Sequence, residues 1–344
     1  MAGKRVKPSS RRPAPARRAG RALYRTLVVL SAVIVALFCA YKLASKPPTQ
    51  APAMSTPKAV RPTDNPDTEE REDLADPVPA LERKPYTYTV LLACSDATSG
   101  NADTIMVAMY DTVNQQAGLV SIPRDTLVQG YGKINAAYHK GPENLRDVVS
   151  DMLGIPIDYY VTASVKGFIA LVNEVGGVDF NIPIHMGYYD PTQELSIFYE
   201  PGMTHLNGQQ AMEVCRFRHS NDGSGSEYSD IGRTQTQQQV LSLIVKKVLS
   251  NPQKIGKYIE IFSQYVKSDM PLETMLWFAE PALGFDLSTG LQSATLPGDP
   301  DVRYQGSRWH YQLYPDQTLD ILNGFLNPYT TPMTEDMLNI FQVA

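Results

Sequence analysis

The segment 215–219 contains the residues whose chemistry is easiest to interpret. Its sequence is Cys-Arg-Phe-Arg-His, with Arg216 and Arg218 two positions apart. In a strand these two side chains would point to one face, about 7 Å apart, where two cations repel each other unless an anion lies between them. Guanidinium is well shaped for two-point contact with phosphate oxygens. The pair therefore predicts a phosphate or pyrophosphate site, and the alternative is a solvated strand face.

Acidic residues lie at the ends of predicted strands. Asp96 follows the first predicted strand, and Asp103 begins the second. Loops at strand ends are where α/β folds collect binding groups. Two carboxylates brought together there would suit Mg²⁺, which takes one or two carboxylates and completes its octahedron with water and phosphate oxygens. The alternative for each aspartate is a turn or cap residue.

Further polar residues follow a third predicted strand. Arg124 and Asp125 come directly after it, and Lys133 and Asn135 add a cation and an amide. Phosphoryl transfer needs little covalent help from a protein, because positioning and neutralisation of negative charge supply most of the catalysis. This set of residues is typical of such chemistry.

The elements that must position these residues alternate between strand and helix patterns. Predicted strands cover 86–94, 103–110, 118–122 and 178–182, and predicted helices cover 145–153, 164–175 and a long segment from Asp230 with apolar residues at 240, 241, 244, 245 and 248. The alternation predicts an α/β or mixed α+β fold with a central mixed sheet covered by helices. The stretch 86–335 is long enough to form one domain with a sizeable core.

The N-terminal region predicts a membrane anchor. Residues 1–22 form a basic tail, and the first 25 residues hold nine Lys or Arg and no Asp or Glu. The apolar run 23–44 would make ~33 Å of helix, enough to span a bilayer core of about 30 Å. The basic flank predicts a cytoplasmic N-terminus and an extracellular domain. A cleaved signal peptide is the competing interpretation, but no small-x-small site directly follows the run.

Residues 45–85 differ sharply in composition from what precedes and follows them. This segment is rich in Pro, Thr, Asp and Glu and poor in large apolar residues. It cannot bury enough surface to offset its ordering entropy, so we expect a disordered stalk. Since the formal charge is −5 in total and +9 in the first 25 residues, −14 remains for the rest. That balance argues against a nucleic-acid binder, which would need a basic face.

Nine motifs stand in the order found in the LytR-CpsA-Psr family of bacterial envelope enzymes, which this chain resembles. They are LLACSD at 91–96, ADTIM at 102–106, SIPRD at 121–125, KINAAY at 133–138, LGIPIDYY at 153–160, GGVD at 176–179, HLNG at 205–208, RFRH at 216–219 and GR at 232–233. The resemblance covers 86 to about 250, and 326–329 more loosely.

The resemblance implies a membrane-anchored phosphotransferase. Such an enzyme moves a glycopolymer (teichoic acid, capsule or another secondary polysaccharide) from a polyprenyl pyrophosphate carrier to a sugar hydroxyl of peptidoglycan. It uses Mg²⁺, and a long apolar groove holds the lipid. By motif, Asp96 and Asp103 would bind the metal, and catalysis would involve Asp103 with Arg124, Arg216 and Arg218. The pyrophosphate-binding positions would be Arg124, Lys133, Asn135, Arg216, Arg218, Arg233 and Gln237. Asp125 would either orient Arg124 or bind metal.

Several points stay open at this level. Thr236 stands where family members often have a second arginine. Because a site with one arginine fewer would hold a pyrophosphate less tightly, the identity of the glycopolymer donor is left undetermined. Cys94 and Cys215 either form a disulfide or are two buried small apolar residues. A membrane-tethered glycan-binding or regulatory module, and a polyprenyl pyrophosphate phosphatase, are the alternative functions. The oligomeric state is not determined.

The first testable prediction concerns topology. Protease added to intact, wall-stripped cells should remove the domain after Ala44 and leave residues 1–25 protected, because the basic flank holds the N-terminus in the cytoplasm. Immunodetection of tags at both ends measures this. A protected domain would contradict the extracellular assignment.

Overall fold

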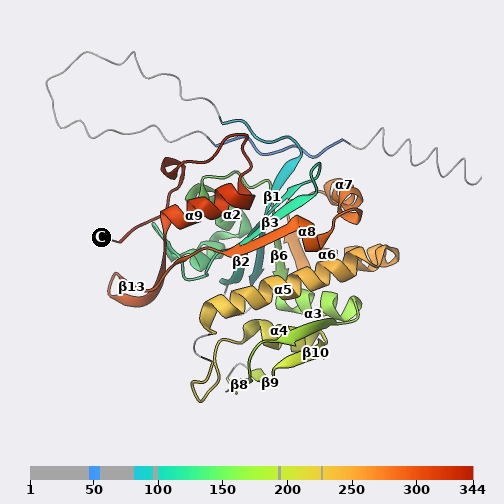
Figure 1. Ribbon diagram of the computed structural model, residues 1–344, viewed down its shortest axis with the longest axis vertical. Coiled ribbons are helices and arrows are strands. Elements are labelled where there is room, and N and C mark those ends of the chain that lie inside the picture. Colours follow the sequence, from blue (N-terminus) through green and yellow to red (C-terminus); the bar gives the residue numbers. More distant parts are fainter. Residues whose placement is uncertain (1–45, 55–80, 96–99, 193–194, 226–227, 344) are drawn as a thin grey trace, which may run out of the picture. The chain divides into compact units, whose positions relative to one another are not determined.

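The structure is a computed structural model that describes residues 46–54, 81–95, 100–192, 195–225 and 228–343 (Figure 1). The predicted basic tail 1–22, the predicted membrane span 23–44 and most of the predicted stalk 45–85 lie outside these residues. Within the described part of the chain, no helix is long and apolar enough to cross a membrane. The chain divides after Pro48, and the fold described below belongs to the part from Thr49 onward.

A six-stranded mixed sheet lies at the centre of this part, in the order β11-β6-β1-β2-β3-β12. Strands β1, β2 and β3 form an antiparallel meander, while β6 runs parallel to β1 and β12 runs parallel to β3. The strands are β1 (Thr87–Ser95), β2 (Ala102–Asp111), β3 (Gln116–Ser121), β6 (Tyr159–Ser164), β11 (Val266–Ser268) and β12 (Leu291–Thr295). The predicted mixed sheet covered by helices is confirmed.

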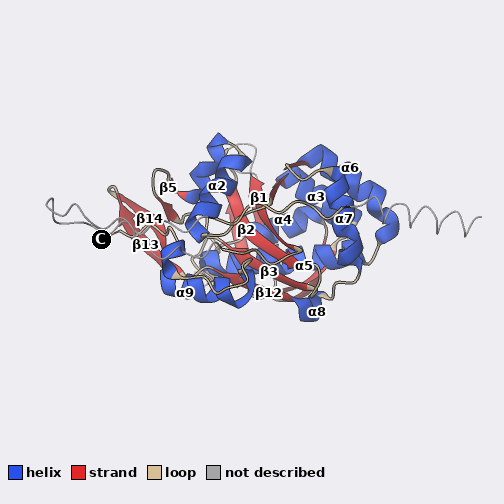
Figure 2. Ribbon diagram, turned by 90° about the horizontal axis from the view of Figure 1, so that it is seen from above, coloured by secondary structure: helices blue, strands red, loops and turns tan. Residues whose placement is uncertain are grey.

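Helices cover both faces of the sheet, with α2 and α9 on one side and α3 to α6 on the other (Figure 2). The α-helices are α2 (Pro142–Leu153), α3 (Val165–Glu174), α4 (Gly208–Arg216), α5 (Ser229–Leu249), α6 (Ile255–Tyr265), α7 (Leu272–Leu283), α8 (Leu287–Gly290) and α9 (Pro315–Ile321). Small antiparallel pairs are β4 (Leu127–Val128) with β5 (Gly132–Lys133), β7 (Val178–Ile182) with β10 (Gly202–Leu206), β8 (Met186–Asp190) with β9 (Leu195–Tyr199), and β13 (Gly298–Tyr304) with β14 (Ser307–Leu313).

Two separate hydrophobic cores hold these layers together. The first packs one face of β1 and β2, including Leu91 and Ile105, against α2 and the segment that follows α9. The second lies between α3, α4, α5 and the strands β7 to β10, with Phe180, Phe217 and Val240 among its buried residues. The other face of the central sheet, between the two cores, borders the cavity described below.

The motif at 205–208 forms the junction between β10 and α4. Asn207 is the N-cap, and its side chain accepts a hydrogen bond from the Gln210 backbone amide while the Gln210 side chain accepts one from the Asn207 amide. A Cβ on Gly208 would lie only 2.3 Å from the carbonyl oxygen of Ile169 in α3. The glycine therefore allows close packing of α4 on α3, and the motif fixes where α4 begins.

The segment 215–219 is not a strand, so that prediction is wrong. Helix α4 continues to Arg216, and Phe217 follows as its C-cap with extended backbone. The reason is the helical spacing of buried residues: Met212 and Cys215, three positions apart, lie on the buried side of α4. Arg216 and Arg218 consequently project from the end of a helix and the loop after it.

A buried ion pair fixes the start of the fold. The two terminal nitrogens of the Arg83 guanidinium donate to the Asp158 carboxylate: Nη1 to Oδ1 at 2.6 Å and Nη2 to Oδ2 at 2.9 Å. The Arg83 side chain is 7% exposed and that of Asp158 is 0% exposed. The same carboxylate accepts hydrogen bonds from the backbone amides of Thr89 and Ala51. Two described parts of the predicted stalk, at Ala51 and Arg83, therefore contact the domain.

Replacing Asp158 by Asn should lower the free energy of unfolding by about 3 kcal/mol or more, because Arg83 would stay buried without an opposite charge. The matched control is Asp147→Asn, since Asp147 is 68% exposed and pairs with Arg146 at the surface. Its loss should stay below about 1 kcal/mol. Urea denaturation of both variants measures the difference, and equal losses would contradict the role of Asp158.

Candidate active site

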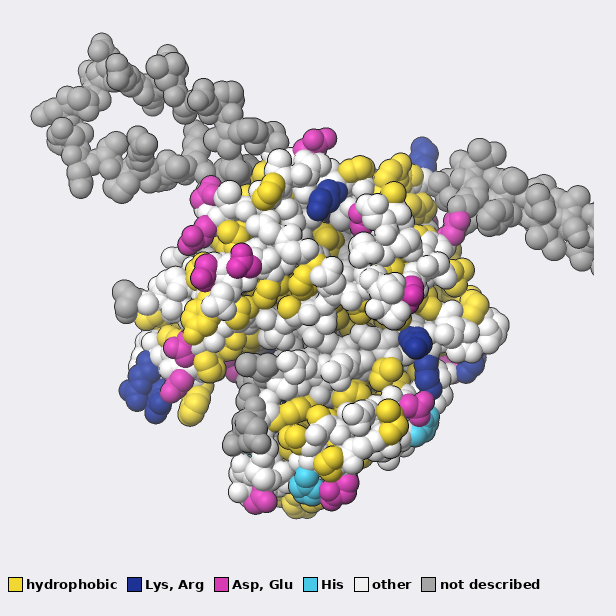
Figure 3. Space-filling model, in the orientation of Figure 1, with side chains coloured by type: hydrophobic (Ala, Val, Ile, Leu, Met, Phe, Trp, Pro, Cys, Tyr) yellow, Lys and Arg dark blue, Asp and Glu magenta, His cyan; other side chains and the backbone are white. Residues whose placement is uncertain are grey.

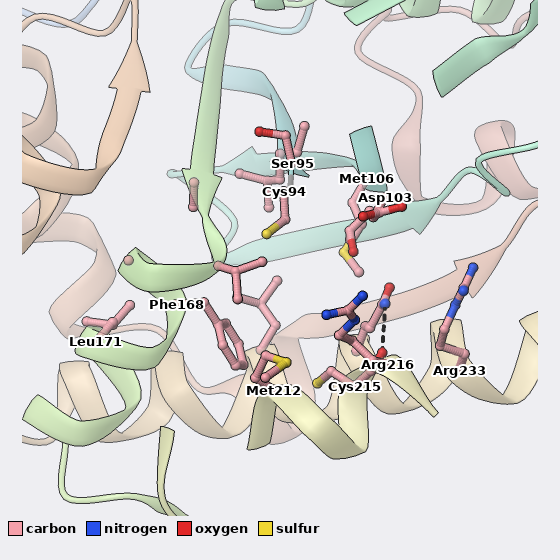
Figure 4. A pocket seen from close by; sticks show the side chains of 18 of the residues that line it. Cys94, Ser95, Asp103, Met106, Phe168, Leu171, Met212, Cys215, Arg216 and Arg233 are labelled. Carbon is pink, nitrogen blue, oxygen red and sulfur yellow. Dashed lines mark hydrogen bonds between the residues drawn. The ribbon is translucent and has the colours of Figure 1, made fainter. Parts of the chain in front are cut away.

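A cavity of about 1400 Å³ lies between the second face of the central sheet and helices α3 to α6. One end is apolar and the other is charged: Figure 4 shows Phe168, Leu171 and Met212 on one side, and Asp103 and Arg233 on the other. The apolar lining also comes from Leu92, Val161, Leu241, Ile244, Val248, Ile261 and Phe262. The cavity therefore suits a long molecule with one apolar end and one anionic end.

Arg124 and Asp103 form an ion pair at the charged end. Arg124 Nη1 donates to Asp103 Oδ1 at 2.5 Å, and both side chains are partly exposed. The Arg124 carbonyl accepts a hydrogen bond from the Asn135 amide, and Asn135 also lines the cavity. Asp125 Oδ2 lies 3.9 Å from Arg124 Nε, and Asp125 Oδ1 accepts from Lys133 Nζ at 2.9 Å. Lys133 thus contacts Asp125, and it is not one of the described residues that line the cavity.

Three more arginines line the same end of the cavity: Arg216 at the end of α4, Arg218 in the following loop, and Arg233 on α5. The C-terminal end of a helix has partial negative charge, which favours a cation at Arg216. Among the described residues that line the cavity, Asp103 is the only carboxylate. Four arginines with one carboxylate make this end suitable for a multiply charged anion.

One face of α5 runs the length of the cavity. Arg233 and Gln237, four residues apart, lie at its charged end, and Leu241, Ile244 and Val248 continue the same face into the apolar end. Gln237 also donates to the Cys215 carbonyl at 3.1 Å, which ties α5 to the end of α4. The helical spacing of these apolar residues was evident in the sequence and predicted the helix, but it did not predict the cavity that this face lines.

Gln238 is a structural residue that the sequence analysis missed. Its buried amide donates to Ser121 Oγ at 2.9 Å and to the Ala294 carbonyl at 2.8 Å. These bonds join α5 to β3 and β12 and so hold one wall of the cavity against the sheet. No sequence signal distinguishes this glutamine from its neighbours at 237 and 239.

The LytR_cpsA_psr family model matches residues 56–323. The chain belongs to the LytR_cpsA_psr family. The resemblance predicted from its motifs is therefore confirmed.

The sequence and the crystal structure of one Bacillus subtilis relative, TagV, support this membership. The chain is 32% identical over 262 residues to the polyisoprenyl-teichoic acid–peptidoglycan teichoic acid transferase TagV of strain 168, which covers 72% of this chain and 65% of TagV. The crystal structure of B. subtilis TagV has a TM-score of 0.58 at 29% identity, covering 69% of this chain and 95% of that one. This chain spans 65% of the length of TagV, and it spans 51% and 50% of the lengths of two other curated relatives.

A structure of TagT bound to LI-WTA has a TM-score of 0.57 at 23% identity, covering 76% of this chain and 95% of that chain. At this identity the likeness concerns the fold. It shows that this chain and TagT share the arrangement of sheet and helices described above.

The predicted metal ligands are only partly within the described residues. Asp96 lies outside them, and Asp103 lines the cavity. In the described part of the chain, no group of three or more His, Cys, Asp or Glu residues is arranged to hold a metal. A single carboxylate beside arginines that suit phosphate still fits the needs of Mg²⁺, which binds proteins through one or two carboxylates and takes its other oxygens from phosphate and water.

Thr236, the position at which the resemblance suggested a second arginine, does not line the cavity. Its side chain is buried and its hydroxyl is hydrogen-bonded to the Tyr228 hydroxyl. Gln237, the next residue, does line the cavity. At this turn of α5 the chain therefore presents an amide to the cavity.

Cys94 and Cys215 are not joined by a disulfide, and both line the cavity, from β1 and α4. Cys215 is buried, and burial raises the pKa of its thiol from 9.0 to about 12. Of the two alternatives left open by the sequence, the structure therefore has two reduced cysteines.

Cys215 should resist alkylation in the folded protein, because almost none of its thiol is ionised at pH 8. Iodoacetamide labelling followed by peptide mass spectrometry should show Cys94 modified first and Cys215 modified only on unfolding. Between pH 9 and about 12 the unfolded chain releases the Cys215 proton while the folded chain keeps it. The free energy of unfolding therefore falls as the pH rises through this range. Prompt labelling of folded Cys215 would contradict its burial.

Proposed function

We propose that this protein is a Mg²⁺-dependent transferase that moves a glycopolymer from a polyprenyl pyrophosphate carrier to a hydroxyl of peptidoglycan. The supporting observation is a single cavity with four arginines at one end and an apolar lining at the other. Membership of the LytR_cpsA_psr family and the likeness to the teichoic acid transferase TagV point to the same reaction class.

The apolar end of the cavity matches the lipid part of the proposed donor. At about 1400 Å³ the cavity exceeds the 300–1,000 Å³ typical of sites for small ligands. Its lining of Phe168, Leu171, Leu241 and Phe262 offers no charged partner, as a hydrocarbon chain requires. The orientation follows from α5: the pyrophosphate lies near Arg233 and Gln237, and the prenyl chain extends toward Val248.

The arginines stabilise the group that leaves. The acceptor hydroxyl oxygen attacks the phosphorus that carries the sugar, a new P–O bond forms, and the bond to the bridging oxygen of the pyrophosphate breaks. Polyprenyl phosphate departs with that electron pair, and Arg124, Arg216 and Arg218 neutralise the negative charge that it acquires. The hydroxyl proton passes to a general base.

Asp103 has two candidate tasks in this reaction. Its carboxylate would accept the hydroxyl proton or hold Mg²⁺, with Asp96 as the second predicted metal ligand. The ion, when bound, neutralises charge on the phosphate oxygens. Arg124 orients Asp103 through the 2.5 Å contact, so one oxygen of the carboxylate is engaged by the protein.

The proposed location follows from the donor. A polyprenyl carrier resides in the membrane, and peptidoglycan lies outside it. The basic tail 1–22 and the apolar run 23–44 favour a single-pass protein with a cytoplasmic N-terminus and an extracellular catalytic domain.

The test is a transfer assay with the full chain in detergent micelles. Lipid-linked saccharide, Mg²⁺ and a peptidoglycan acceptor are incubated with the protein, and the products are separated. Saccharide covalently attached to the acceptor supports the proposal. Free saccharide phosphate without attachment would indicate a phosphatase, and no turnover would leave a binding or regulatory module.

Replacing Arg218 by Lys should reduce transfer on the order of 10²-fold, equivalent to about 2.7 kcal/mol, because lysine keeps the charge but loses the planar two-point contact. Arg216→Ala should be at least as harmful. The control is Arg146→Lys, since Arg146 pairs with Asp147 and Asp269 away from the cavity. Normal transfer by folded Arg216 and Arg218 variants would exclude a role for the pair.

Asp103→Asn should shift the Mg²⁺ titration of transfer to higher concentration and lower the turnover, with little change in melting temperature. Asp111→Asn is the matched control, because Asp111 caps a turn with both oxygens: Oδ1 accepts from the Val113 and Asn114 backbone amides, and Oδ2 accepts from Asn114 Nδ2, a bond that the NH2 group of asparagine cannot accept. That variant should lose stability without moving the titration. The same pattern in Asp103→Asn would contradict a metal-binding role.

A further inference from the structure

The β13–β14 hairpin exposes a tryptophan in an unusual backbone conformation. Trp309 is 65% exposed and has φ of +68°, in the left-handed region that side chains other than glycine rarely adopt. An indole at the surface gains little from burial, so neither packing nor backbone preference accounts for it. Strained residues of this kind persist where the surrounding structure imposes them, often at binding sites.

The strand register shows how the conformation is imposed. Val302 pairs with His310, and Tyr304 pairs with Ser307, so β14 has one more residue than β13 between these two pairs. The extra residue forms a bulge. Arg308 and Trp309 are therefore both exposed, whereas the next residues His310 and Tyr311 are both buried. A bulge is a known means of redirecting one side chain from a sheet.

The indole is held in place from one side. The Arg308 guanidinium lies 5.3 Å from the centre of the Trp309 ring, and Arg308 Nη2 donates to Asp301 Oδ2 on β13 at 2.8 Å. Asp301 thus fixes Arg308, and Arg308 supports one face of the ring. The remaining surface of the ring stays exposed in a defined orientation.

The hairpin is also attached to the body of the protein and to the proposed site. Tyr304 packs edge-on against His310 and Phe341, so the C-terminal segment supports the hairpin from behind. The Tyr311 amide donates to the Asp125 carbonyl at 2.9 Å. Because Asp125 directly follows Arg124, β14 is hydrogen-bonded to the segment that forms the charged end of the cavity.

The surroundings of Trp309 favour a sugar as its partner. Asp299, Asp301, Arg303 and Arg308 are all exposed on the hairpin. Figure 3 shows acidic, basic and apolar side chains side by side at the lower left, where Figure 1 labels β13. A bilayer surface would call for contiguous apolar area and an excess of basic residues. A sugar ring instead stacks its C–H face on the electron-rich indole and offers hydroxyls to carboxylates and guanidinium groups.

We propose that the β13–β14 hairpin is a glycan-binding platform on which Trp309 stacks against a pyranose ring of the acceptor strand. The identity of this glycan as the acceptor rests on the proposed function. The platform holds the strand beside the charged end of the cavity, so that a hydroxyl further along reaches the reacting phosphorus. Trp309 acts by positioning the acceptor.

Binding to a soluble oligomer of N-acetylglucosamine, measured with the full chain in micelles and without donor, tests the proposal. The chain has two tryptophans, Trp277 and Trp309, so saccharide should change the fluorescence of the wild type and leave that of Trp309→Phe unchanged. By calorimetry, Trp309→Ala should weaken binding at least tenfold, and Trp309→Phe should retain part of it. The control is Phe198→Ala, an aromatic on β9 with 62% exposure, which should bind normally.

In the transfer assay Trp309→Ala should raise the KM for the acceptor at least tenfold and leave kcat nearly unchanged. Normal saccharide binding by folded Trp309→Ala would overturn the inference. A second result would also overturn it: if Trp309→Ala bound anionic lipid vesicles more weakly than the wild type but bound saccharide normally, the hairpin would be a membrane contact. Saccharide binding that depends on Trp309, in a protein without transfer activity, would overturn the proposed function and leave the platform standing.

Discussion

The structure depends on keeping one face of the central sheet from being packed. Protein interiors normally fill such space to the density of an organic crystal, and apolar side chains that face a cavity lose dispersion contacts. Here Leu92 and Met106 of the sheet face Met212 and Leu241 of the helices across a cavity of about 1400 Å³. The helical layer must therefore be held in position by contacts other than direct packing on that face.

Those contacts lie at the borders of the cavity. Buried Gln238 joins α5 to β3 and β12 at one border, and Gln237 joins α5 to the end of α4. Away from the sheet, Val240 anchors α5 in the second core, and Ile244 belongs both to that core and to the cavity lining. Because α5 has one face in that core and another on the cavity, the same helix supports the layer and lines the site. Its cavity face changes from arginine and glutamine to leucine and valine along its length, which gives a bound amphiphile a single direction.

Asp125 joins two parts of the site. Its side chain contacts Arg124 and Lys133, and its carbonyl accepts the Tyr311 amide of β14. The loop that positions Arg124 at the charged end of the cavity is thus hydrogen-bonded to the hairpin that exposes Trp309. Short-range hydrogen bonds of this kind place a proposed acceptor platform and a proposed phosphate site in a fixed relation without a flexible element between them.

The sequence by itself determined the strands at 86–94, 103–110 and 118–122, the mixed sheet with helices, and the family, because periodicity and ordered motifs are local properties of the chain. It also identified Arg124, Asp103, Arg233 and the arginine pair at 216 and 218 as residues that suit an anion. Residues 1–45 and Asp96 lie outside the described structure, so the anchor and one metal ligand remain predictions.

Only the tertiary structure decided how these residues are presented. Arg216 and Arg218 have the spacing of a strand face, yet burial of Met212 and Cys215 continues α4 through this segment. Lys133 resembled a phosphate ligand, but its ammonium group donates a hydrogen bond to the carboxylate of Asp125, eight residues earlier. The apolar spacing of α5 predicted a helix, but it could not show that Leu241 and Val248 line a cavity while Val240 is buried in the second core. Hydrophobic spacing records which face avoids water and not whether protein fills the space opposite. The exposure of Trp309 depends on the bulge in β14, which has one more residue than β13 between two paired positions. Such a bulge is a property of the pairing and cannot be read from either strand alone.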